Sequence, residues 1–470
     1  LLINGQWLDG SGAKRLAIVN PATEETFAEV CSATADEIGQ AAEAGQAAFE
    51  SGWRDMPPGE RTRLLRNLAK RIHENVETLA QLETRNVGKP IGDARWEADA
   101  GAKVFDYYAG AIGHLCGQTI PVARGGFDFT LRQPMGVIAA ITPWNFPFLI
   151  ACWKVAPALA AGNSVVLKPA SLTPLTALML GQLAQEAGLP DGVLQVVPGS
   201  GSEAGNALAT HPLVRKIGFT GSTEVGATIM KLAADDIKRV SLELGGKSPN
   251  IVFADADWQR AAAESPMSVF ANTGQDCCAR SRMFIEQSVF DGFVDQFVAA
   301  TESLKIGDPM DEATQVGPMV SAAQRELSES HIAGARDAGR EIRTGGDRPN
   351  GGGFYLNPAV VTGVETEDRA WREEIFGPVV CLRPFTDETE MLREVNDTNF
   401  GLSGSVWSND LSRALRVARQ VESGVISINS HSSVHTEAPF GGFKRSGLGR
   451  DLGMSAMEAC TEVKNIYVGE

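Results

Sequence analysis

A cysteine in the second half of the chain lies in a setting that suits a nucleophile. Cys277 ends the polar, glycine-containing segment 270–277, FANTGQDC, and Arg280 and Arg282 follow within a few residues. A thiol in a loop or at a helix start, close to cations, has a lowered pKa and attacks a carbonyl carbon more readily. The alternative is that Cys277 is a small buried hydrophobe, as free cysteines commonly are.

A glutamate lies where a general base could be built. Glu243 stands between Leu242 and Leu244 at the end of a β-prone run, directly before two glycines. Flanking leucines predict partial burial, and burial raises the pKa of a carboxyl group towards the range useful to a general base. The alternative is that Glu243 caps the strand end or pairs with a neighbouring basic residue.

An asparagine is held in a stiff loop. In the segment 141–147, ITPWNFP, Pro143 and Pro147 bracket Asn145 after a β-prone run. The prolines restrict the backbone, so the Asn145 amide could serve as a fixed donor to a developing oxyanion. The alternative is an asparagine that hydrogen-bonds its own turn.

Two glycine-containing segments compete as phosphate sites. Residues 199–204 fit G-x-G-x-x-A after a strand, but the acidic residue expected about 20 positions later is missing. Residues 221–226 follow the run 216–219 and open a helix, whose N-terminal amides could face a phosphate. Lys168, at the end of the run 164–167, could reach a ribose or a phosphate.

The elements that must position these residues alternate between strand and helix. A capping box at 34–37 predicts a helix to Phe49, and 61–73 predicts another. Alternation of this kind favours an α/β fold with parallel sheets covered on both faces. A second alternating series starts after Gly246, so two lobes should meet near residue 245. The β-prone runs of the two series are 137–141, 164–167, 193–197, 216–219 and 239–242, then 250–253, 283–286, 359–362, 379–384 and 424–428.

Two segments fall outside the lobes. Residues 117–133 alternate around a Gly125-Gly126 turn, which predicts a hairpin, and residues 461–468 predict a further strand. We expect the hairpin and the tail strand to pair with another subunit.

Composition excludes several classes of protein. The chain has 470 residues and a formal net charge of −16, which disfavours nucleic-acid binding. No apolar stretch approaches the roughly 18 residues of a membrane helix, and the N-terminus does not read as a secretory signal. Seven cysteines without a C-x-x-C pair or a Cys/His cluster of zinc spacing predict neither disulfides nor a metal site. We therefore expect a cytoplasmic protein.

Seven segments, taken together, resemble the aldehyde dehydrogenase superfamily, and the resemblance runs from Ile3 to Val468. They occur in the order that the family has. The segments are PWNFP at 143–147, KPAS at 168–171, FTGST at 219–223, LELGGKSP at 242–249, GQDC at 274–277, EEIFGP at 373–378 and PFGGFKRSGLGRDLG at 439–453.

The resemblance implies three structural parts and a homodimer or homotetramer. A Rossmann-like nucleotide-binding domain would comprise residues 1–112 and 134–245, and an α/β catalytic domain residues 246–446. A small β oligomerisation element would comprise residues 113–133 and 447–470.

The resemblance also implies oxidation of a small-molecule aldehyde to the acid with NAD or NADP, through a thiohemiacetal and a thioester. Cys277 would be the nucleophile, Glu243 the base and Asn145 the oxyanion donor. Branches that transfer the acyl group to coenzyme A generally lack the base, so Glu243 favours hydrolysis. The implied cofactor-binding residues are Thr142, Trp144, Lys168, Ser171, Gly201, Phe219, Gly221, Ser222, Val225, Gly226, Leu244, Glu374 and Phe376, and the implied substrate-lining residues are Asp106, Phe146, Trp153 and Phe440. The loop 429–435 would lie over the substrate entrance.

Departures from the family pattern bear on specificity. Ser171 stands where NAD-preferring members carry a glutamate that would repel a 2′-phosphate, so NADP is compatible as well as NAD. Trp153 and Ala271 stand where succinate-semialdehyde members carry arginines, which disfavours that substrate. Trp153 and Asp106 are similar to the aminoaldehyde and betaine-aldehyde branches, in which aromatic faces and acids receive a cationic tail. Apolar lining for an aromatic or aliphatic aldehyde is the alternative.

Two other functions compete with this reading. A cofactor-independent cysteine hydrolase or acyltransferase would need a partner histidine, and none of the six histidines lies in a motif that family members use for catalysis. A non-catalytic binding role is the other, against which the intact Cys277, Glu243 and Asn145 argue.

Overall fold

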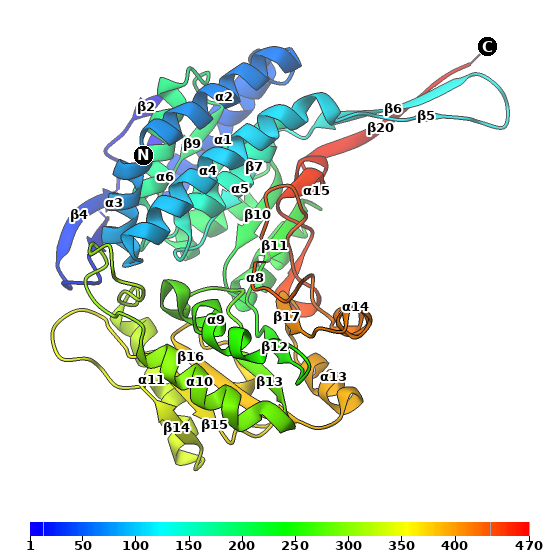
Figure 1. Ribbon diagram of the computed structural model, residues 1–470. Coiled ribbons are helices and arrows are strands. Elements are labelled where there is room, and N and C mark those ends of the chain that lie inside the picture. The colour runs from blue at the N-terminus through cyan, green and yellow to red at the C-terminus, as the bar shows by residue number, and fades with distance from the viewer. Residues whose placement is uncertain (13, 433, 470) are drawn as a thin grey trace.

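The computed structural model describes residues 1–12, 14–432 and 434–469, and Figure 1 shows its two stacked lobes with a ribbon projecting from one side. Ser433, which belongs to the loop 429–435 expected over the substrate entrance, lies outside the described residues. The α/β class predicted from the sequence is confirmed, because each lobe is built on a largely parallel sheet.

The sheet of the first lobe is eight strands wide. Its central strands are parallel. The strand order runs from β7 outward through β8 and β9 and then resumes with β10 on the other side of β7, and sheets with this topology have a crevice at the carboxyl ends of the two strands where the order reverses. In spatial order the strands are β19 (Gly447–Leu448), β11 (Arg239–Glu243), β10 (Val214–Thr220), β7 (Val137–Ile141), β8 (Ser164–Lys168), β9 (Leu194–Val196), β1 (Leu2–Ile3) and β2 (Gln6–Trp7).

Helices cover both faces of this sheet because successive side chains of a strand point to opposite sides. On β7, Ile138 and Ala140 join the apolar cluster around α5 (Pro147–Ala160), which is buried along its whole length. Val137 and Ala139 join the opposite cluster. The first face carries α2 (Pro58–Glu74), α4 (Ile91–Ala111) and α6 (Leu175–Glu186), with α3 (Val76–Val87) against α4; the second carries α1 (Ala35–Ala48), α7 (Asn206–Thr210) and α8 (Thr223–Ala233).

The predicted start of α1 is confirmed in detail. Thr34 caps the helix, and the carboxylate of Glu37 accepts a hydrogen bond from the Thr34 backbone N–H at 2.9 Å.

The sheet of the second lobe has seven strands, all parallel except β14 at its edge. In spatial order they are β14 (Glu341–Thr344), β15 (Ala359–Thr362), β16 (Val379–Phe385), β13 (Arg282–Glu286), β12 (Pro249–Val252), β17 (Ser403–Trp407) and β18 (Val425–Ile428). The accompanying helices are α9 (Trp258–Phe270), α10 (Phe290–Glu302), α11 (Ala322–Asp337), α12 (Arg369–Arg372), α13 (Glu388–Asn396) and α14 (Leu411–Gln420).

A five-residue link, 244–248, joins β11 of the first sheet to β12 of the second. Two glycines make this close passage possible. A Cβ on Gly246 would lie 2.3 Å from the carbonyl oxygen of Cys277, and one on Gly245 would overlap the Glu374 carboxylate. The link therefore threads between two segments of the second lobe that side chains would push apart.

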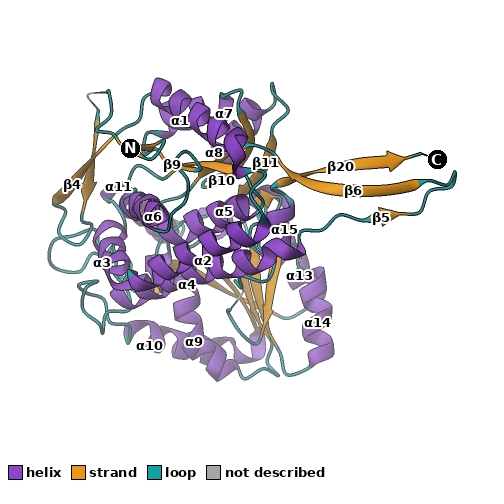
Figure 2. Cartoon of the chain, turned by 90° about the horizontal axis from the view of Figure 1, so that it is seen from above, coloured by secondary structure: helices purple, strands orange, loops and turns teal. Residues whose placement is uncertain are grey.

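The projecting ribbon is a three-stranded antiparallel sheet of β5 (Thr119–Ile120), β6 (Phe127–Pro134) and β20 (Thr461–Val468). Figure 2 shows it extending well beyond both lobes. The remaining hairpin is β3 (Arg15–Val19) with β4 (Thr26–Cys31). No helix among the described residues is long and apolar enough to cross a membrane.

The expected limits of the oligomerisation element need correction at residues 447–460. β19 pairs with β11 inside the first sheet, and α15 (Gly453–Glu458) packs against α5. Residues 447–460 therefore belong to the first lobe, and only residues 461–468 of the C-terminal segment enter the ribbon.

Candidate active site

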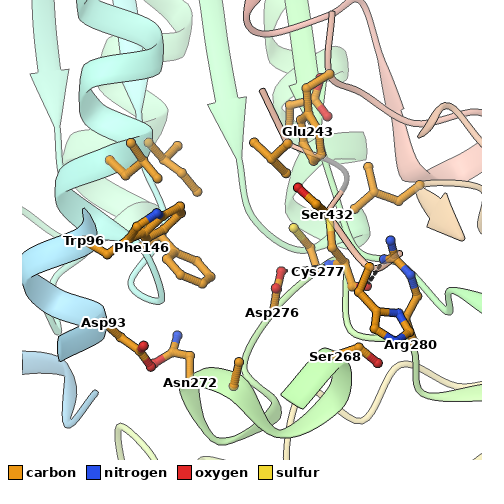
Figure 3. A pocket seen from close by; sticks show the side chains of 18 of the residues that line it. Asp93, Trp96, Phe146, Glu243, Ser268, Asn272, Asp276, Cys277, Arg280 and Ser432 are labelled. Carbon is orange, nitrogen blue, oxygen red and sulfur yellow. Dashed lines mark hydrogen bonds between the residues drawn. The ribbon is translucent and has the colours of Figure 1, made fainter. Parts of the chain in front are cut away.

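A cavity of about 530 Å³ lies at the junction of the two lobes, and Cys277 and Glu243 both line it. Figure 3 shows Cys277 and Asp276 facing Phe146 and Trp96 across the open space, with Glu243 above Cys277. Three of the four predicted substrate-lining residues are in its wall, Phe146, Trp153 and Phe440.

The sheet register explains this convergence. Glu243 is the last residue of β11, and the short link places β12 immediately beyond it. Arg282, the first residue of β13, pairs with Pro249, the first residue of β12. Cys277 lies five positions before Arg282, so the carboxyl end of one sheet meets the loop that precedes a strand of the other.

The loop that carries Cys277 has an unusual backbone. Asn272, Thr273 and Gly274 all have positive φ, at 48°, 59° and 72°. Such a run costs free energy for residues other than glycine and persists only where the surroundings enforce it. The Gln275 side chain holds the loop in this conformation. Its amide nitrogen donates to the Asn272 backbone carbonyl at 3.0 Å, and its amide oxygen accepts from the Val320 N–H at 2.9 Å.

The environment of the Cys277 thiol differs from the sequence-based expectation. Hydrogen bonding to Cys278 and then burial raise its pKa well above the ordinary value, and the negative charges of Asp276 and Glu374 act in the same direction. Arg280 donates to the Cys278 carbonyl oxygen and to the Ser405 hydroxyl. The predicted lowering of the pKa by nearby cations is therefore wrong for the thiol at rest.

The second arginine bonds to backbone oxygens of the second lobe. Arg282 donates to the backbone oxygens of Lys247 and Val395 at 3.0 and 2.9 Å. Its burial inside the second lobe explains why proximity in sequence to Cys277 brings no stabilisation of a thiolate.

Asn145 is bonded to the loop of Cys277. Its side-chain amide donates to the Gln275 carbonyl at 2.9 Å, and its own carbonyl accepts from the Asn272 amide at 3.0 Å. The Asn145 side chain is buried, and these two contacts fix it between the lobes. An amide nitrogen has two hydrogens, so one remains for another acceptor.

Glu243 is only 3% exposed, and neither carboxylate oxygen has a hydrogen-bond partner among the described residues. Burial raises its pKa well above the usual range, and the negative charge of Asp451 adds to the effect. Asp451 is itself paired with Lys154 at 2.9 Å, and both are buried. An unpartnered buried carboxylate on a cavity wall retains its full capacity to accept a proton.

Aromatic rings form much of the substrate wall. The rings of Trp153 and Phe440 lie 5.4 Å apart, and the Lys89 amine lies 4.3 Å from the centre of the Phe146 ring. Lys89 is buried and forms ion pairs with Glu83 and Glu97.

The expected position of the acid on α4 needs correction. Asp106 is exposed and does not line the cavity, whereas Asp93 and Trp96 of the same helix do. Asp93 and Asp106 are separated by 13 positions, which is about 20 Å along a helix. Burial raises the pKa of Asp93, and Glu97 contributes in the same direction. The sequence contains one signal for Asp93, which is a carboxylate in the first turn of a helix and close to Trp96.

The loop 429–435 does reach the cavity, through His431, Ser432 and Val434. His431 is held between two hydroxyl groups, Ser265 at 3.2 Å and Ser405 at 3.3 Å. Burial, with the charge of Arg280, lowers its pKa to about 3, so the ring is neutral. His431 belongs to the loop that the family resemblance places over the substrate entrance, although no individual role was predicted for it.

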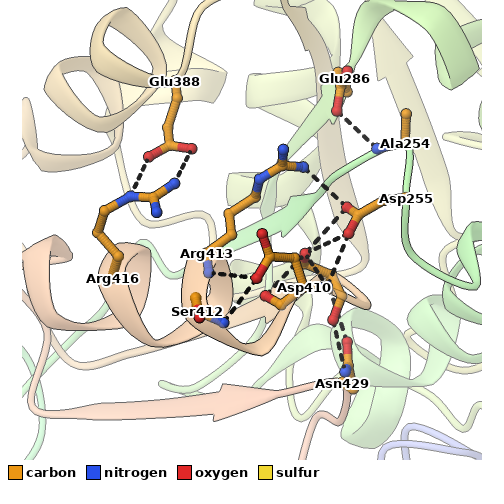
Figure 4. A network of polar contacts seen from close by, with 10 residues as sticks. Ala254, Asp255, Glu286, Glu388, Asp410, Ser412, Arg413, Arg416 and Asn429 are labelled. Carbon is orange, nitrogen blue, oxygen red and sulfur yellow. Dashed lines mark hydrogen bonds and ion pairs between the residues drawn. The ribbon is translucent and has the colours of Figure 1, made fainter.

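A polar network fixes the base of this loop (Figure 4). Asp255 accepts from the Ser408 hydroxyl at 2.9 Å and from Arg413 at 3.1 Å. Asn429, whose φ is 52°, exchanges two hydrogen bonds of 3.0 Å with the backbone of Ser408. The loop therefore starts from a rigid anchor.

The crevice at the carboxyl ends of β7, β8, β10 and β11 collects the predicted cofactor residues. Thr142 follows β7 and is buried, and its hydroxyl has no hydrogen-bond partner among the described residues, while Lys168 ends β8. The Lys168 amine is buried, donates to the Pro169 carbonyl at 2.9 Å and has its pKa lowered to about 8 by burial. The Ser171 hydroxyl donates to the Gly199 carbonyl at 3.0 Å. The Lys168 ammonium has three N–H donors, and the Pro169 carbonyl takes one of them, so the others can bind ribose hydroxyls.

The helix α8 presents its N-terminus to the same crevice. Ser222 caps it and accepts from the Val225 N–H at 3.3 Å. A Cβ on Gly221 would clash with the Phe219 ring, and one on Gly226 with Leu244. The close packing behind the helix start leaves its first amides open to a phosphate. Gly201 is exposed at the start of a short π-helix, Gly201–Gly205, and a Cβ there would meet no other described residue within 4 Å.

Two residues of the second lobe complete the crevice. Glu374 accepts from the Gly246 N–H at 3.0 Å, and burial raises its pKa to about 7. The Phe376 ring meets that of Trp144 edge to face, with centroids 5.1 Å apart. These contacts bring the EEIFGP and PWNFP segments together, and the residues present fit a nicotinamide dinucleotide.

Comparisons with known proteins agree with this geometry. The model of the "Aldehyde dehydrogenase family" matches residues 7–466. Betaine aldehyde dehydrogenase 1 of Oryza sativa subsp. japonica is 43% identical over 99% of this chain and 94% of its own length. Phenylacetaldehyde dehydrogenase of Pseudomonas fluorescens is 43% identical over 100% and 95%. The solved NAD⁺ complex of aldehyde dehydrogenase from Bacillus cereus has 40% identity and a TM-score of 0.98, and the match covers 99% of this chain and 96% of that one.

Proposed function

The chain belongs to the aldehyde dehydrogenase family, and from this premise we propose that it oxidises an aldehyde to the free carboxylic acid through a thioester on Cys277. The protein is an NAD(P)-dependent oxidoreductase. The observation that carries the mechanism is the meeting of Cys277 and Glu243 in one cavity, with Asn145 bonded to the loop of Cys277.

The first step is addition of sulfur to the aldehyde carbon. Because the Cys277 pKa is raised in the resting site, a base must remove the thiol proton. We assign this proton to a water molecule of the cavity, which passes it to solvent as sulfur adds to the carbon. The Glu243 carboxylate, whose oxygens have no hydrogen-bond partner among the described residues, therefore stays free for the hydrolysis step.

The negative oxygen that forms needs fixed donors. The second N–H of the Asn145 amide and the Cys277 backbone N–H are the donors that we assign to it. Because Asn145 is already bonded to Gln275, little reorganisation is needed when charge develops.

Collapse of the tetrahedral adduct gives the thioester. When bound, the nicotinamide supplies the acceptor for the hydride that leaves the tetrahedral carbon. Glu243 then accepts a proton from water, the hydroxide adds to the thioester carbon, and the Cys277 thiolate leaves. The acid diffuses from the cavity.

The wall of the cavity supports a substrate with an apolar or aromatic body and a neutral or cationic tail. Trp153, Phe440 and Phe146 provide the apolar surface, and Asp93 lies next to Trp96 where a tail would end. Relatives are named for betaine aldehyde, aminoaldehyde and phenylacetaldehyde oxidation, which matches these two kinds of surface.

A cofactor-independent cysteine hydrolase is less well supported. His431 is in the cavity wall, but both ring nitrogens face serine hydroxyls and the ring stays neutral. It is therefore not placed to activate Cys277.

We also propose that the ribbon of β5, β6 and β20 joins copies of the chain into a homodimer or homotetramer. Apolar side chains are exposed along it, including Phe127, Leu131, Val463 and Tyr467. Exposed apolar strands of this kind commonly mark a protein interface.

Cofactor reduction and acid production, measured with a panel of aminated, aromatic, aliphatic and carboxylated aldehydes, test the proposal. Cys277→Ser should abolish both, whereas Cys116→Ser, which alters an exposed cysteine that does not line the cavity, should not. Glu243→Gln should retain a first burst of cofactor reduction, while steady turnover falls by about 10²- to 10⁴-fold. Full turnover in Glu243→Gln would remove Glu243 from the mechanism.

A further inference from the structure

We propose that Asp276, Cys277 and Cys278 form a binding site for a soft divalent cation such as Zn²⁺, which blocks the enzyme reversibly. One ligand atom from each of the three residues lies within 4.8 Å of the others. Binding itself is independent of the proposed function. Only its inhibitory consequence rests on Cys277 being the nucleophile.

The three side chains contact one another directly. The thiol of Cys277 is within hydrogen-bonding range of the Cys278 thiol, and the Asp276 carboxylate is within range of Cys277. The three ligand atoms of a tetrahedral zinc, two sulfurs and one carboxylate oxygen, are therefore already close. Little movement of the side chains is needed to gather them around a cation.

The backbone that carries these ligands is rigid. The Cys278 N–H donates to Asp276 at 2.8 Å, and the Cys278 carbonyl accepts from the buried Arg280. The Cys277 carbonyl packs against Gly246, where no Cβ could be accommodated. A site held in this way loses little conformational entropy on binding, which favours affinity.

The site is open to the cavity. Asp276, Cys277 and Cys278 all line it, so a cation can enter from the substrate side and keep a water molecule as its fourth ligand. Three protein ligands with one open position form a recognised zinc arrangement. Two sulfurs select a soft cation over Mg²⁺ or Ca²⁺, which prefer oxygen.

The local charge favours a cation. The Asp276 carboxylate is one of the three ligands, and a dication would compensate its negative charge. The amine of Lys89, on the opposite wall, is already paired with Glu83 and Glu97. Binding replaces the two thiol protons by two Zn–S bonds and releases the protons to solvent, with no change of oxidation state.

Inhibition follows from the identity of one ligand. A thiolate bound to zinc shares its electron pair with the metal, so Cys277 could not add to a carbonyl carbon until the metal leaves. The spacing C-x-x-C does not reveal this site, because its two cysteines are adjacent in the sequence.

Metal binding should be measured first, without aldehyde or cofactor. Co²⁺ titrated into the reduced, full-length protein should produce a sulfur-to-cobalt charge-transfer band that saturates at one metal per chain, and Zn²⁺ should displace it. Cys278→Ser and Cys277→Ser should lose the band and weaken Zn²⁺ binding by a factor on the order of 100. Cys116→Ser, the matched exposed cysteine, should behave as wild type.

Activity is the second measurement. Zn²⁺ should inhibit aldehyde oxidation by the wild type, and a chelator should restore it. Each variant is compared with its own zinc-free rate, and Cys278→Ser should need on the order of 100 times more Zn²⁺ for the same inhibition. Circular dichroism confirms folding, and Asp276→Asn provides a further variant with weakened binding should Cys278→Ser not fold.

The outcomes separate the two proposals. A charge-transfer band in a protein that oxidises no aldehyde supports the metal site and contradicts the proposed function. Three results would overturn the metal site, whatever the activity. The charge-transfer band could persist in Cys278→Ser, it could disappear in Cys116→Ser, or it could be absent from the wild type with excess Co²⁺.

Discussion

The side-chain amide of Asn145 donates a hydrogen bond of 2.9 Å to the backbone carbonyl of Gln275, two residues before Cys277. Asn145 follows β7 of the first lobe, and Gln275 precedes β13 of the second. The donor proposed for the oxyanion is thus attached to the loop of the nucleophile itself. A change at Asn145 should affect both transition-state charge and the geometry of that loop.

Asn145→Ala should lower kcat by about 10²- to 10³-fold, which is the usual cost of losing one oxyanion donor. KM should change much less, because the interaction forms in the transition state. Steady-state kinetics of cofactor reduction measure both constants. Asn67→Ala, which also removes an amide bonded to a backbone carbonyl, should leave kcat unchanged. Equal loss in the two variants would indicate a general effect on stability.

Asp451→Asn should move the acidic limb of the pH–kcat profile to lower pH. Asp451 is a negative charge that raises the Glu243 pKa, so its neutralisation lowers that pKa and leaves more carboxylate at acidic pH. Lys154, released from its ion pair, acts in the same direction. Asp311→Asn, an exposed acid paired with Lys305, serves as the control and should not shift the profile. A shift to higher pH in Asp451→Asn would contradict this account.

Ser171→Glu should shift cofactor preference towards NAD. The new carboxylate replaces a hydroxyl that donates to Gly199, and it would lie where a 2′-phosphate approaches. Charge repulsion of this kind should raise KM for NADP by roughly tenfold or more, with a smaller effect on NAD. Ser171→Gln has similar size without charge and is the matched control. If both variants raise KM for NADP equally, the size of the new side chain and not its charge is responsible.

Asp93→Asn should raise KM for an ω-aminoaldehyde by about tenfold, because it removes the negative charge that we expect beside the ammonium group. KM for an uncharged aldehyde of the same length should not change. Asp106→Asn is the matched control on the same helix, and its exposed position outside the cavity predicts no effect. A larger effect at Asp106 would restore the sequence-based assignment.

Much of the fold could be predicted from the sequence. The β-prone runs at 137–141 and 359–362 coincide with β7 and β15, and the capping box at Thr34 starts α1. These features are local, since they depend on β-branched runs and on a side chain that bonds its own helix start. Gly447 and Leu448 escaped prediction because their strand is defined only by its partner, β11.

The sequence by itself determined which functional groups the molecule has: a thiol after a glycine-containing loop, a carboxylate at a strand end and an amide between two prolines. Only the tertiary structure decided the environment of each group. It bonded Arg280 and Arg282 to backbone oxygens, left Glu243 without a hydrogen-bond partner among the described residues, and brought Asp93 instead of Asp106 to the cavity. The physical reason is that burial, charge and side-chain direction at a site are set by segments distant in the chain, which local patterns do not encode.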